Sequence, residues 1–342
     1  MVLVTWPDYP DESSTSVAAL TSVGLTVRRA PRLRDRSEDE VIELLRDCVA
    51  GIVSTDSITR RVIESSPALR ILARVGVGTD SIDLEAATER QVAVTVARGS
   101  NEPAVADHTV GLMLALLRRI PQLDTMVRDE RWLRTGPWAG HDLTGKTVGL
   151  LGMGTIAGLV ARRLSGFDSR VIGYDPVAPP PPGVAPASFE EVVADSDVLS
   201  LHLPLTTHTR GMVDDRFLAA MKPGAVLINT SRGAIVDEVA VARALDEGRL
   251  AGAALDVFVR EPPLGSPVLP RRENTVLTPH IAGLSHEAID DMVGQATDAV
   301  VAAFSGRAPR GLVNDPRCPI WDGHIPSRVA GVNQPERKHN ER

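Results

Sequence analysis

The stretch Val148-Gly-Leu-Leu-Gly-Met-Gly-Thr-Ile-Ala157 decides the fold of this chain, because an apolar strand leads through two glycines into a helical pattern. The first glycine permits a tight turn, the second lets backbone approach a pyrophosphate, and the final alanine is small enough for the helix to pack on the strand. Free N–H groups and the helix dipole attract anions. We therefore expect Gly152, Gly154, Thr155 and Ile156 to hold the phosphates of a dinucleotide; an ordinary strand-to-helix turn is the alternative.

An acidic residue ends the next predicted strand, residues 170–174. Asp175 stands 23 positions after Gly152, and an acidic side chain at this point accepts hydrogen bonds from the ribose hydroxyls and repels a 2′-phosphate. The sequence therefore predicts NAD rather than NADP as the cofactor. The alternative is that Asp175 is only a turn residue before Pro176.

Strand and helix patterns alternate on both sides of this stretch. Short β-branched runs separated by roughly 10–15 helical residues indicate βαβ units and parallel sheets. Two such series predict an α/β protein with two Rossmann-like, doubly wound parallel-sheet domains. The expected strands are residues 1–5, 24–28, 51–53, 69–74 and 92–96 in the first series, and residues 146–151, 170–174, 198–203, 225–229, 252–255 and 274–277 in the second.

Two long helices are expected where the series meet. Residues 105–120 are apolar nearly all round up to Pro121, which predicts a helix buried between domains or subunits and favours a homodimer. A helix over residues 287–304 returns the chain to the first domain. The expected organisation is a discontinuous substrate domain of residues 1–99 plus 285–314, a cofactor domain of residues 100–284, and a poorly ordered polar tail of residues 315–342.

The composition argues against several classes of protein. The chain has 342 residues, 37 Lys and Arg, 44 Asp and Glu, and a formal net charge of −7, so it lacks the basic excess of nucleic-acid-binding proteins. Two isolated cysteines predict neither a metal site nor a disulfide framework. No signal peptide and no apolar run long enough for a bilayer are found. A cytoplasmic protein without a membrane partner is expected.

Further motifs follow one another across residues 50–305. They are Arg74-Val-Gly-Val-Gly-Thr-Asp80, Val105-Ala-Asp-His108, His202-Leu-Pro-Leu-Thr206, Met221-Lys-Pro-Gly224, Asn229-Thr-Ser-Arg-Gly-Ala-Ile-Val-Asp-Glu238, Ala253-Ala-Leu-Asp-Val-Phe258, Glu261-Pro-Pro263 and Thr278-Pro-His-Ile-Ala-Gly283. Together with the glycine stretch, these motifs resemble the D-isomer-specific 2-hydroxyacid dehydrogenases, most of all the phosphoglycerate dehydrogenase and C-terminal-binding-protein-like branch.

The resemblance implies that the chain interconverts a D-2-hydroxy acid and its 2-keto acid with NAD(H), through Arg232, Glu261 and His280. The chemistry of these side chains fits the reaction. An imidazole exchanges protons near neutral pH, and a carboxylate beside it fixes its tautomer. A guanidinium presents a planar fork to the carboxylate and carbonyl oxygens of a keto acid, which a lysine does not.

The same resemblance implies the residues that line the two binding sites. Asp256 is expected to contact the nicotinamide carboxamide, and the cofactor cleft to be lined by Leu203, Pro204, Thr230 and Gly283. Backbone N–H groups of Val77 and Gly78 are expected to hold the substrate carboxylate, with Asn101 at the hinge beside it and Arg74 adding positive charge. For Arg74, a surface arginine at a strand end is an equal alternative.

The substrate stays open at this point. Phosphoglycerate dehydrogenases often carry an arginine after the strand that corresponds to residues 51–53, where this chain has Ser54-Thr-Asp56. A phosphorylated or phosphono acid similar to 3-phosphoglycerate is thus one possibility among other 2-hydroxy acids. Arg131 and Arg134 reach a substrate anion or lie in a solvated loop. Two other functions remain. One is an NAD(H)-sensing, corepressor-like binding protein. The other is formate or phosphite oxidation, which is disfavoured because residues 75–80 lack the lysine expected of phosphite enzymes and because Glu261 suits the keto-acid reaction.

Overall fold

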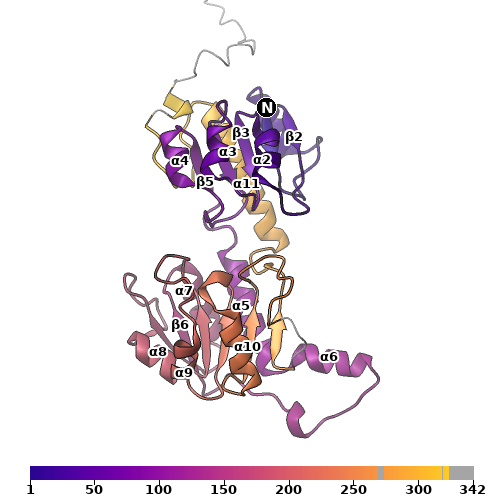
Figure 1. The fold of residues 1–342 in the computed structure, drawn as a ribbon, viewed down its shortest axis with the longest axis vertical. Coiled ribbons are helices and arrows are strands. Elements are labelled where there is room, and N and C mark those ends of the chain that lie inside the picture. Colours follow the sequence, from indigo (N-terminus) through magenta and orange to yellow (C-terminus); the bar gives the residue numbers. More distant parts are fainter. Residues whose placement is uncertain (269–272, 318, 323–342) are drawn as a thin grey trace, which may run out of the picture. The chain divides into compact units, whose positions relative to one another are not determined.

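The computed structural model describes residues 1–268, 273–317 and 319–322, and the chain divides into two compact units (Figure 1). Unit 1 consists of Met1–Asn101 and the chain from His286 on, and unit 2 is Glu102–Ser285. Each unit contains one sheet of parallel strands flanked by helices. The fold is therefore α/β with two Rossmann-like domains, the first of which is discontinuous in sequence.

Unit 1 contains a five-stranded sheet in the order β2-β1-β3-β4-β5, so the strand order reverses between β1 and β3. Polar caps start its helices: Ser37 and Glu40 form a reciprocal capping box at the start of α2. The strands are β1 (Val2–Val4), β2 (Val27–Arg29), β3 (Ala50–Val53), β4 (Ile71–Arg74) and β5 (Ala93–Val96), and the helices before the crossover to unit 2 are α1 (Thr15–Ser22), α2 (Glu38–Leu45), α3 (Arg60–Glu64) and α4 (Leu84–Glu89).

The last helix, α11 (His286–Phe304), belongs to unit 1. Its Thr297 hydroxyl hydrogen bonds to the Tyr9 hydroxyl at 2.7 Å, and the segment after it adds Leu312 to the sheet by an antiparallel bridge to Thr95. The predicted tail is not irregular throughout, because Ile320–Asp322 forms a 3-10 helix against α11. Residues 318 and 323–342 of that tail lie outside the described residues.

Unit 2 contains a seven-stranded sheet in the order β12-β11-β10-β9-β6-β7-β8, and its strand order reverses between β6 and β9. Ligands of open α/β sheets bind at the carboxyl ends of the strands beside such a reversal. The strands are β6 (Thr147–Leu151), β7 (Arg170–Tyr174), β8 (Ala185–Pro186), β9 (Val198–Leu201), β10 (Val226–Asn229), β11 (Gly252–Leu255) and β12 (Thr275–Leu277), and the helices are α5 (Glu102–Leu117), α6 (Ile120–Arg128), α7 (Thr155–Leu164), α8 (Phe189–Asp195), α9 (Asp215–Ala220) and α10 (Glu238–Asp246).

Alternating side chains bury both faces of this sheet. On β10, Leu227 packs with side chains of α9 and α10, whereas Val226 and Ile228 pack with side chains of α5 and α7. The apolar sequence of α5 thus fills the core of unit 2. The helix expected over residues 105–120 ends earlier, at Leu117, because Arg119 adopts a left-handed φ of 54°.

Two elements were absent from the sequence prediction. Pro121 does not end a helix but lies in the first turn of α6, where its missing N–H costs nothing. The proline-rich segment after β7 contains the two-residue edge strand β8, which a pattern of strand residues could not show. Within residues 1–268, 273–317 and 319–322, no helix has the length and apolar character to cross a membrane, and no group of three or more His, Cys, Asp or Glu side chains is placed to hold a metal ion.

Candidate active site

The glycine loop joins β6 to α7 beside the reversal of strand order. Gly152 has a φ of 90°, and a Cβ there would lie 2.3 Å from the carbonyl oxygen of His202. Gly154 caps α7 with no side-chain hydrogen bond, and nothing lies within 4 Å of where its Cβ would be. Thr155 and Ile156 are the first two residues of α7, so their amides belong to a helix N-terminus without a side-chain cap, an arrangement that fits the pyrophosphate of NAD.

Asp175 follows β7 and faces the glycine loop. Its carboxylate accepts the amide of Met153 at 2.9 Å and those of Val177 and Ala178 at 2.8 Å each. Burial by itself raises the pKa of Asp175, but these three N–H donors outweigh burial and lower the pKa below its usual value. Asp175 therefore organises the turn before the proline-rich segment and stays ionised, which leaves its part in ribose binding a prediction.

The other residues expected at the cofactor lie at the same edge of the sheet. Leu203 and Pro204 follow β9, Thr230 follows β10, Asp256 follows β11, and Gly283 lies in the turn after β12. The Thr230 hydroxyl is buried and hydrogen bonds to the Thr109 hydroxyl at 2.9 Å. These residues are thus brought to one edge, as parallel strands require.

Arg232 lies in a loop shaped by the side chain of Asn229. The Asn229 amide donates to the carbonyl oxygen of Arg232 at 3.0 Å, and its oxygen accepts the amide and hydroxyl of Ser231. A Cβ on Gly233 would lie 1.9 Å from the carbonyl carbon of Phe258. Only glycine lets the loop after β10 come this close to the segment that leads to Glu261.

His280 and Glu261 form the central contact of the site. The ring Nδ1 lies 2.6 Å from Glu261 Oε2, and Glu261 Oε1 accepts the Phe258 amide at 3.1 Å. Burial by itself raises the pKa of Glu261, but the hydrogen bonds and charge of His280, the Phe258 amide and the charge of Arg232 together lower it below its usual value. The carboxylate thus holds Nδ1, and the other ring nitrogen, Nε2, is on the side of the ring away from Glu261.

Asp256 holds the turn that carries His280. Its carboxylate is fully buried and accepts the Thr278 hydroxyl at 2.6 Å and the amides of Ile281 and Ala282 at 2.9 Å. The amide of His280 also donates to the Asp256 carbonyl oxygen, and His280 adopts a left-handed φ of 53°. The histidine is therefore held in an uncommon backbone conformation by a buried carboxylate.

The residues expected to bind substrate through unit 1 lie after its strands. Arg74 ends β4, and its guanidinium packs over Gly76, where a Cβ would meet Arg74 Nη1 at 2.3 Å. Val77 and Gly78 follow in the next loop, and Asn101 is the last residue before α5. In unit 2, Arg131 is exposed, and its guanidinium lies 6.0 Å from the centre of the Trp138 ring. These packing partners of Arg74 and Arg131 were not predicted from the sequence.

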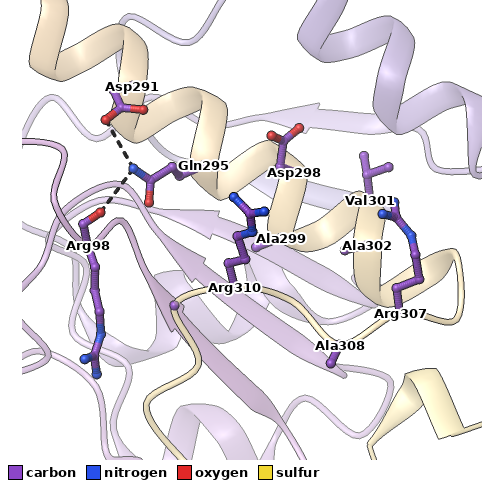
Figure 2. Close-up of a pocket in the computed structure, with 11 residues that line it drawn as sticks. Arg98, Asp291, Gln295, Asp298, Ala299, Val301, Ala302, Arg307, Ala308 and Arg310 are labelled. Atoms are coloured by element: carbon purple, nitrogen blue, oxygen red, sulfur yellow. Dashed lines mark hydrogen bonds between the residues drawn. The ribbon is translucent and has the colours of Figure 1, made fainter.

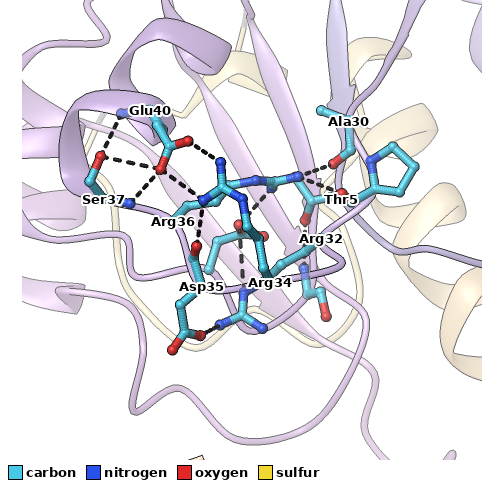
Figure 3. Close-up of polar contacts among 11 residues, drawn as sticks. Thr5, Ala30, Arg32, Arg34, Asp35, Arg36, Ser37 and Glu40 are labelled. Carbon is cyan, nitrogen blue, oxygen red and sulfur yellow. Dashed lines mark hydrogen bonds and ion pairs between the residues drawn. The ribbon is translucent and has the colours of Figure 1, made fainter. Parts of the chain in front are cut away.

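Asp56, the third residue after β3, is buried against arginines of the segment that follows β2, whose polar contacts are drawn in Figure 3. The Arg36 guanidinium donates to Asp56 Oδ1 at 2.8 Å and to the carbonyl oxygens of Ala30 and Pro31. Arg32 Nε lies 3.9 Å from the same oxygen of Asp56, whose side chain is 1% exposed. The sequence Ser54-Thr-Asp56, where phosphoglycerate dehydrogenases often carry an arginine, thus places a buried carboxylate at Asp56 that pairs with arginines of its own unit.

Unit 1 contains a groove of about 790 Å³, and Figure 2 draws the residues that line it. Its lining includes Arg98, Asp291, Gln295, Asp298 and Arg310, and Gln295 donates to the carbonyl oxygen of Arg98 at 3.2 Å. No residue predicted for catalysis, cofactor or substrate is among the lining residues. The side chains around the groove carry both signs of charge, so its volume alone assigns it no ligand.

The sequence analysis missed three residues that organise the site. Asn229 and Gly233 shape and approach the arginine loop, and His108 hydrogen bonds through Nε2 to the Thr278 hydroxyl at 3.1 Å. Asn229 and Gly233 stand in the motif that contains Arg232. A buried asparagine at a strand end and a glycine directly after the arginine were the available signals.

Comparison with known proteins agrees with this geometry. Residues 110–282 match the family model described as "D-isomer specific 2-hydroxyacid dehydrogenase, NAD binding domain". A glyoxylate reductase of Korarchaeum cryptofilum is 40% identical over 81% of this chain and 86% of its own length. A D-3-phosphoglycerate dehydrogenase of Mycobacterium leprae is 35% identical over 92% of this chain, which spans 55% of that protein.

A solved structure extends the comparison to the whole fold. The D-lactate dehydrogenase of Aquifex aeolicus, complexed with NAD and lactic acid, superposes with a TM-score of 0.82 and 27% identity over 92% of this chain and all of that one. The glycine loop, the match to the NAD-binding domain and the identity to these relatives lead to one conclusion. The chain belongs to the D-isomer-specific 2-hydroxyacid dehydrogenase family and is an NAD-dependent oxidoreductase that acts on CH–OH groups.

Proposed function

We propose that this enzyme interconverts a D-2-hydroxy acid and its 2-keto acid, with His280 as the acid and base, Glu261 as its partner and Arg232 as the group that binds the substrate carboxylate. The 2.6 Å contact between His280 Nδ1 and Glu261 carries the proposal. It leaves Nε2 of the ring for the substrate oxygen. It also lies in the unit whose glycine loop fits NAD, which supplies or accepts the hydride when bound.

In the direction of reduction, His280 gives the proton on Nε2 to the carbonyl oxygen as that oxygen gains negative charge. The Glu261 carboxylate stabilises the protonated ring before the transfer and keeps Nδ1 protonated after it. Arg232 lies close enough for its charge to lower the pKa of Glu261, and its fork suits the carboxylate and carbonyl oxygens of a keto acid. Oxidation of the hydroxy acid runs through the same groups in reverse.

We further propose that unit 1 holds the substrate carboxylate through the amides of Val77 and Gly78, with Arg74 and Asn101 beside them. Asp175 is proposed to bind the ribose and Asp256 the nicotinamide carboxamide. The remaining residues proposed to line the cofactor site are Gly152, Gly154, Thr155, Ile156, Leu203, Pro204, Thr230 and Gly283.

The substrate we favour is a small 2-oxo acid whose substituent on the oxo carbon is uncharged; this is a short alkyl group in the keto acids that yield D-2-hydroxy acids, and a hydrogen atom in glyoxylate, whose product is achiral. Asp56, the acidic residue after β3, takes up the charge of Arg36 within unit 1. A phosphorylated acid similar to 3-phosphoglycerate is the second candidate, because one relative with 35% identity carries that name. The two candidates differ in charge, so one assay separates them.

The deciding assay follows the loss of NADH absorbance with glyoxylate, other unphosphorylated 2-keto acids, and phosphorylated and phosphono keto acids. Turnover of the small acids is expected to exceed that of the phosphorylated acids. The reverse order would assign the phosphorylated class. No turnover with any acid, combined with tight NADH binding, would favour an NAD(H)-sensing binding protein.

Two variants test the assigned roles. His280→Ala is expected to lower turnover by roughly 100-fold or more while NADH binding is retained.

Arg232→Lys is expected to lower keto-acid turnover by about tenfold or more, because an ammonium cannot match the planar fork. Full turnover in either variant would remove that residue from the mechanism.

We propose that the enzyme is a cytoplasmic homodimer. Apolar side chains of α6 and the segment after it are exposed, with Ile120 at 53%, Val127 at 54% and Trp132 at 74%. The buried side chains of α5 pack within unit 2, so we now assign the contact between subunits to this exposed segment instead. Light scattering of the wild type and of Trp132→Glu tests the proposal, which predicts a dimer and a shift toward monomer.

A further inference from the structure

The carboxylate of Glu238 joins both ends of the loop that carries Glu261. Glu238 is the first residue of α10 and lies outside the proposed catalytic group. Its Oε1 accepts the amide of Val259 at 2.8 Å, and its Oε2 accepts the hydroxyl of Ser266. Val259 and Ser266 are the first and last residues of what we term the Glu261 loop, residues 259–266.

This loop is exposed and therefore depends on polar contacts. Val259 is 58% and Leu264 74% exposed, whereas the flanking residues Phe258 and Val268 are buried. Within the loop, the amides of Leu264 and Ser266 donate to the carbonyl oxygens of Pro262 and Pro263. These local bonds shape the loop but do not fix it to the domain, whereas Glu238 ties its two ends to a helix of the core.

We propose that Glu238 is a positioning residue, which sets the place of Glu261 against the ring of His280. The inference rests on the proposed function for its effect on turnover. A carboxylate is suited to the role because it accepts at two oxygens and can hold two loop ends at once. Small displacements of a catalytic group cost large factors in rate, so a loosened loop lowers turnover without removing any reacting group.

The variants form a graded series with a matched control. Ser266→Ala removes one tether, Glu238→Ala removes both, and Glu238→Gln keeps the side-chain length with a single acceptor oxygen. Asp237→Ala is the control, since Asp237 caps α10 through the amides of Val239 and Ala240 and does not touch the loop. It weakens the same helix end to a similar degree.

The kinetic measurement is NADH-linked reduction of the best keto acid by the full chain. Glu238→Ala is expected to lower kcat by about tenfold with KM and NADH affinity nearly unchanged, and Glu238→Gln to restore part of the loss. Glu238→Ala is expected to add no further loss to Glu261→Gln, because both act through one group. Multiplicative losses, or equal effects of Glu238→Ala and Asp237→Ala, would overturn the proposal.

A second measurement does not depend on turnover. The proton on His280 Nδ1 is expected to give a downfield NMR signal, since it lies in a short hydrogen bond to a carboxylate. Glu238→Ala should weaken or abolish this signal, and Asp237→Ala should retain it. Both variants keep Arg232, Asp256 and His108. An unchanged signal in Glu238→Ala would sink the proposal even if the enzyme reduced no acid of the panel, an outcome that would instead refute the proposed function.

Discussion

Two buried aspartates follow strands in the two units and are held by different kinds of donor. Asp256 follows β11 in unit 2 and Asp56 follows β3 in unit 1, and their exposed fractions are 0% and 2%. Asp256 accepts hydrogen bonds from a hydroxyl and two backbone amides, which are neutral donors, and its Oδ1 lies 3.7 Å from Nε2 of His108. Asp56 is paired with the guanidinium of Arg36.

The difference shows two uses of a buried carboxylate: one fixes the backbone of a site, and the other forms an ion pair that only stabilises the fold. Neutral donors leave the charge of Asp256 in place while its oxygens fix the backbone around His280. The arginine cancels the charge of Asp56, so this residue holds residues 30–36 to the sheet and offers no net charge to a ligand. We therefore expect the two aspartates to affect turnover and stability in different proportions.

The largest effect is expected from Asp256→Ala. Removing the carboxylate leaves the amides of Ile281 and Ala282 without their acceptor and releases the turn that carries His280. We expect turnover to fall by roughly 100-fold or more and the free energy of unfolding by about 3 kcal/mol. Urea denaturation and steady-state kinetics measure the two losses.

The matched control for that variant is Asp214→Ala. Asp214 also accepts a backbone amide, that of Phe217, and caps α9, but its carboxylate hydrogen bonds to no described residue that is assigned to the site. This variant is expected to lose about 1 kcal/mol of stability and to keep its turnover. If Asp256→Ala lost stability alone, in the manner of the control, Asp256 would be a structural residue only.

Asp56→Ala is expected to act mainly on stability. It leaves the Arg36 guanidinium, whose side chain is 11% exposed, with its two carbonyl acceptors but without its anionic partner, and breaking a buried ion pair typically costs about 3–5 kcal/mol. Turnover of small keto acids at saturating concentrations is expected to stay within about threefold of the wild type, because no reacting group moves. A joint change of Asp56 to Leu and Arg36 to Met should recover most of the stability.

A gain in turnover of phosphorylated keto acids by Asp56→Ala would revise the comparison. It would mean that the released Arg36 reaches the substrate and that Asp56 selects against anionic side chains. Unchanged stability, by contrast, would contradict the role of the pair in holding residues 30–36.

The sequence was sufficient to predict those parts of the fold and the site whose contacts are local. The glycine loop, Asp175 and the alternating strands follow from short-range pattern, and the assigned triad is recognisable from motifs in their order. The tethers of the site were not predictable, because Glu238 meets Ser266 and Gly233 meets Phe258 only through the packing of distant segments. Likewise, the sequence showed only that residues 54–56 lack the arginine that phosphoglycerate dehydrogenases often carry there. The arginine that pairs with Asp56 is Arg36, which stands twenty positions earlier.

A third polar side chain at a strand end, that of His202, adds to the comparison because it is an uncharged ring and not a carboxylate. The His202 ring follows β9 and hydrogen bonds to the Ser200 hydroxyl at 3.0 Å, and burial lowers the pKa of His202 from 6.5 to about 4. Because the folded-state pKa is below the unfolded one, the unfolded chain binds the proton more readily. His202 therefore lowers the free energy of unfolding as the pH falls from 6.5 toward 4, and has little effect on it at higher pH.

Urea denaturation at pH 7 and pH 5 measures this cost against His202→Gln, whose amide does not titrate. The wild type is expected to lose about 2 kcal/mol more than the variant between the two pH values. Equal losses would show that the ring of His202 is protonated in the folded enzyme or is open to solvent.

The smallest effect is expected at Asp175, which combines features of both aspartates. Its backbone donors resemble those of Asp256, but it is only half-buried, so its oxygens keep the capacity to accept ribose hydroxyls. Asp175→Ser removes the charge that repels a 2′-phosphate, and we expect it to narrow the preference for NAD over NADP by about tenfold. Asp175→Asn keeps the shape and one acceptor oxygen, so it separates charge from turn geometry. If both variants kept the preference of the wild type, the three backbone amides would account for Asp175 entirely, and the ribose would be recognised by other residues.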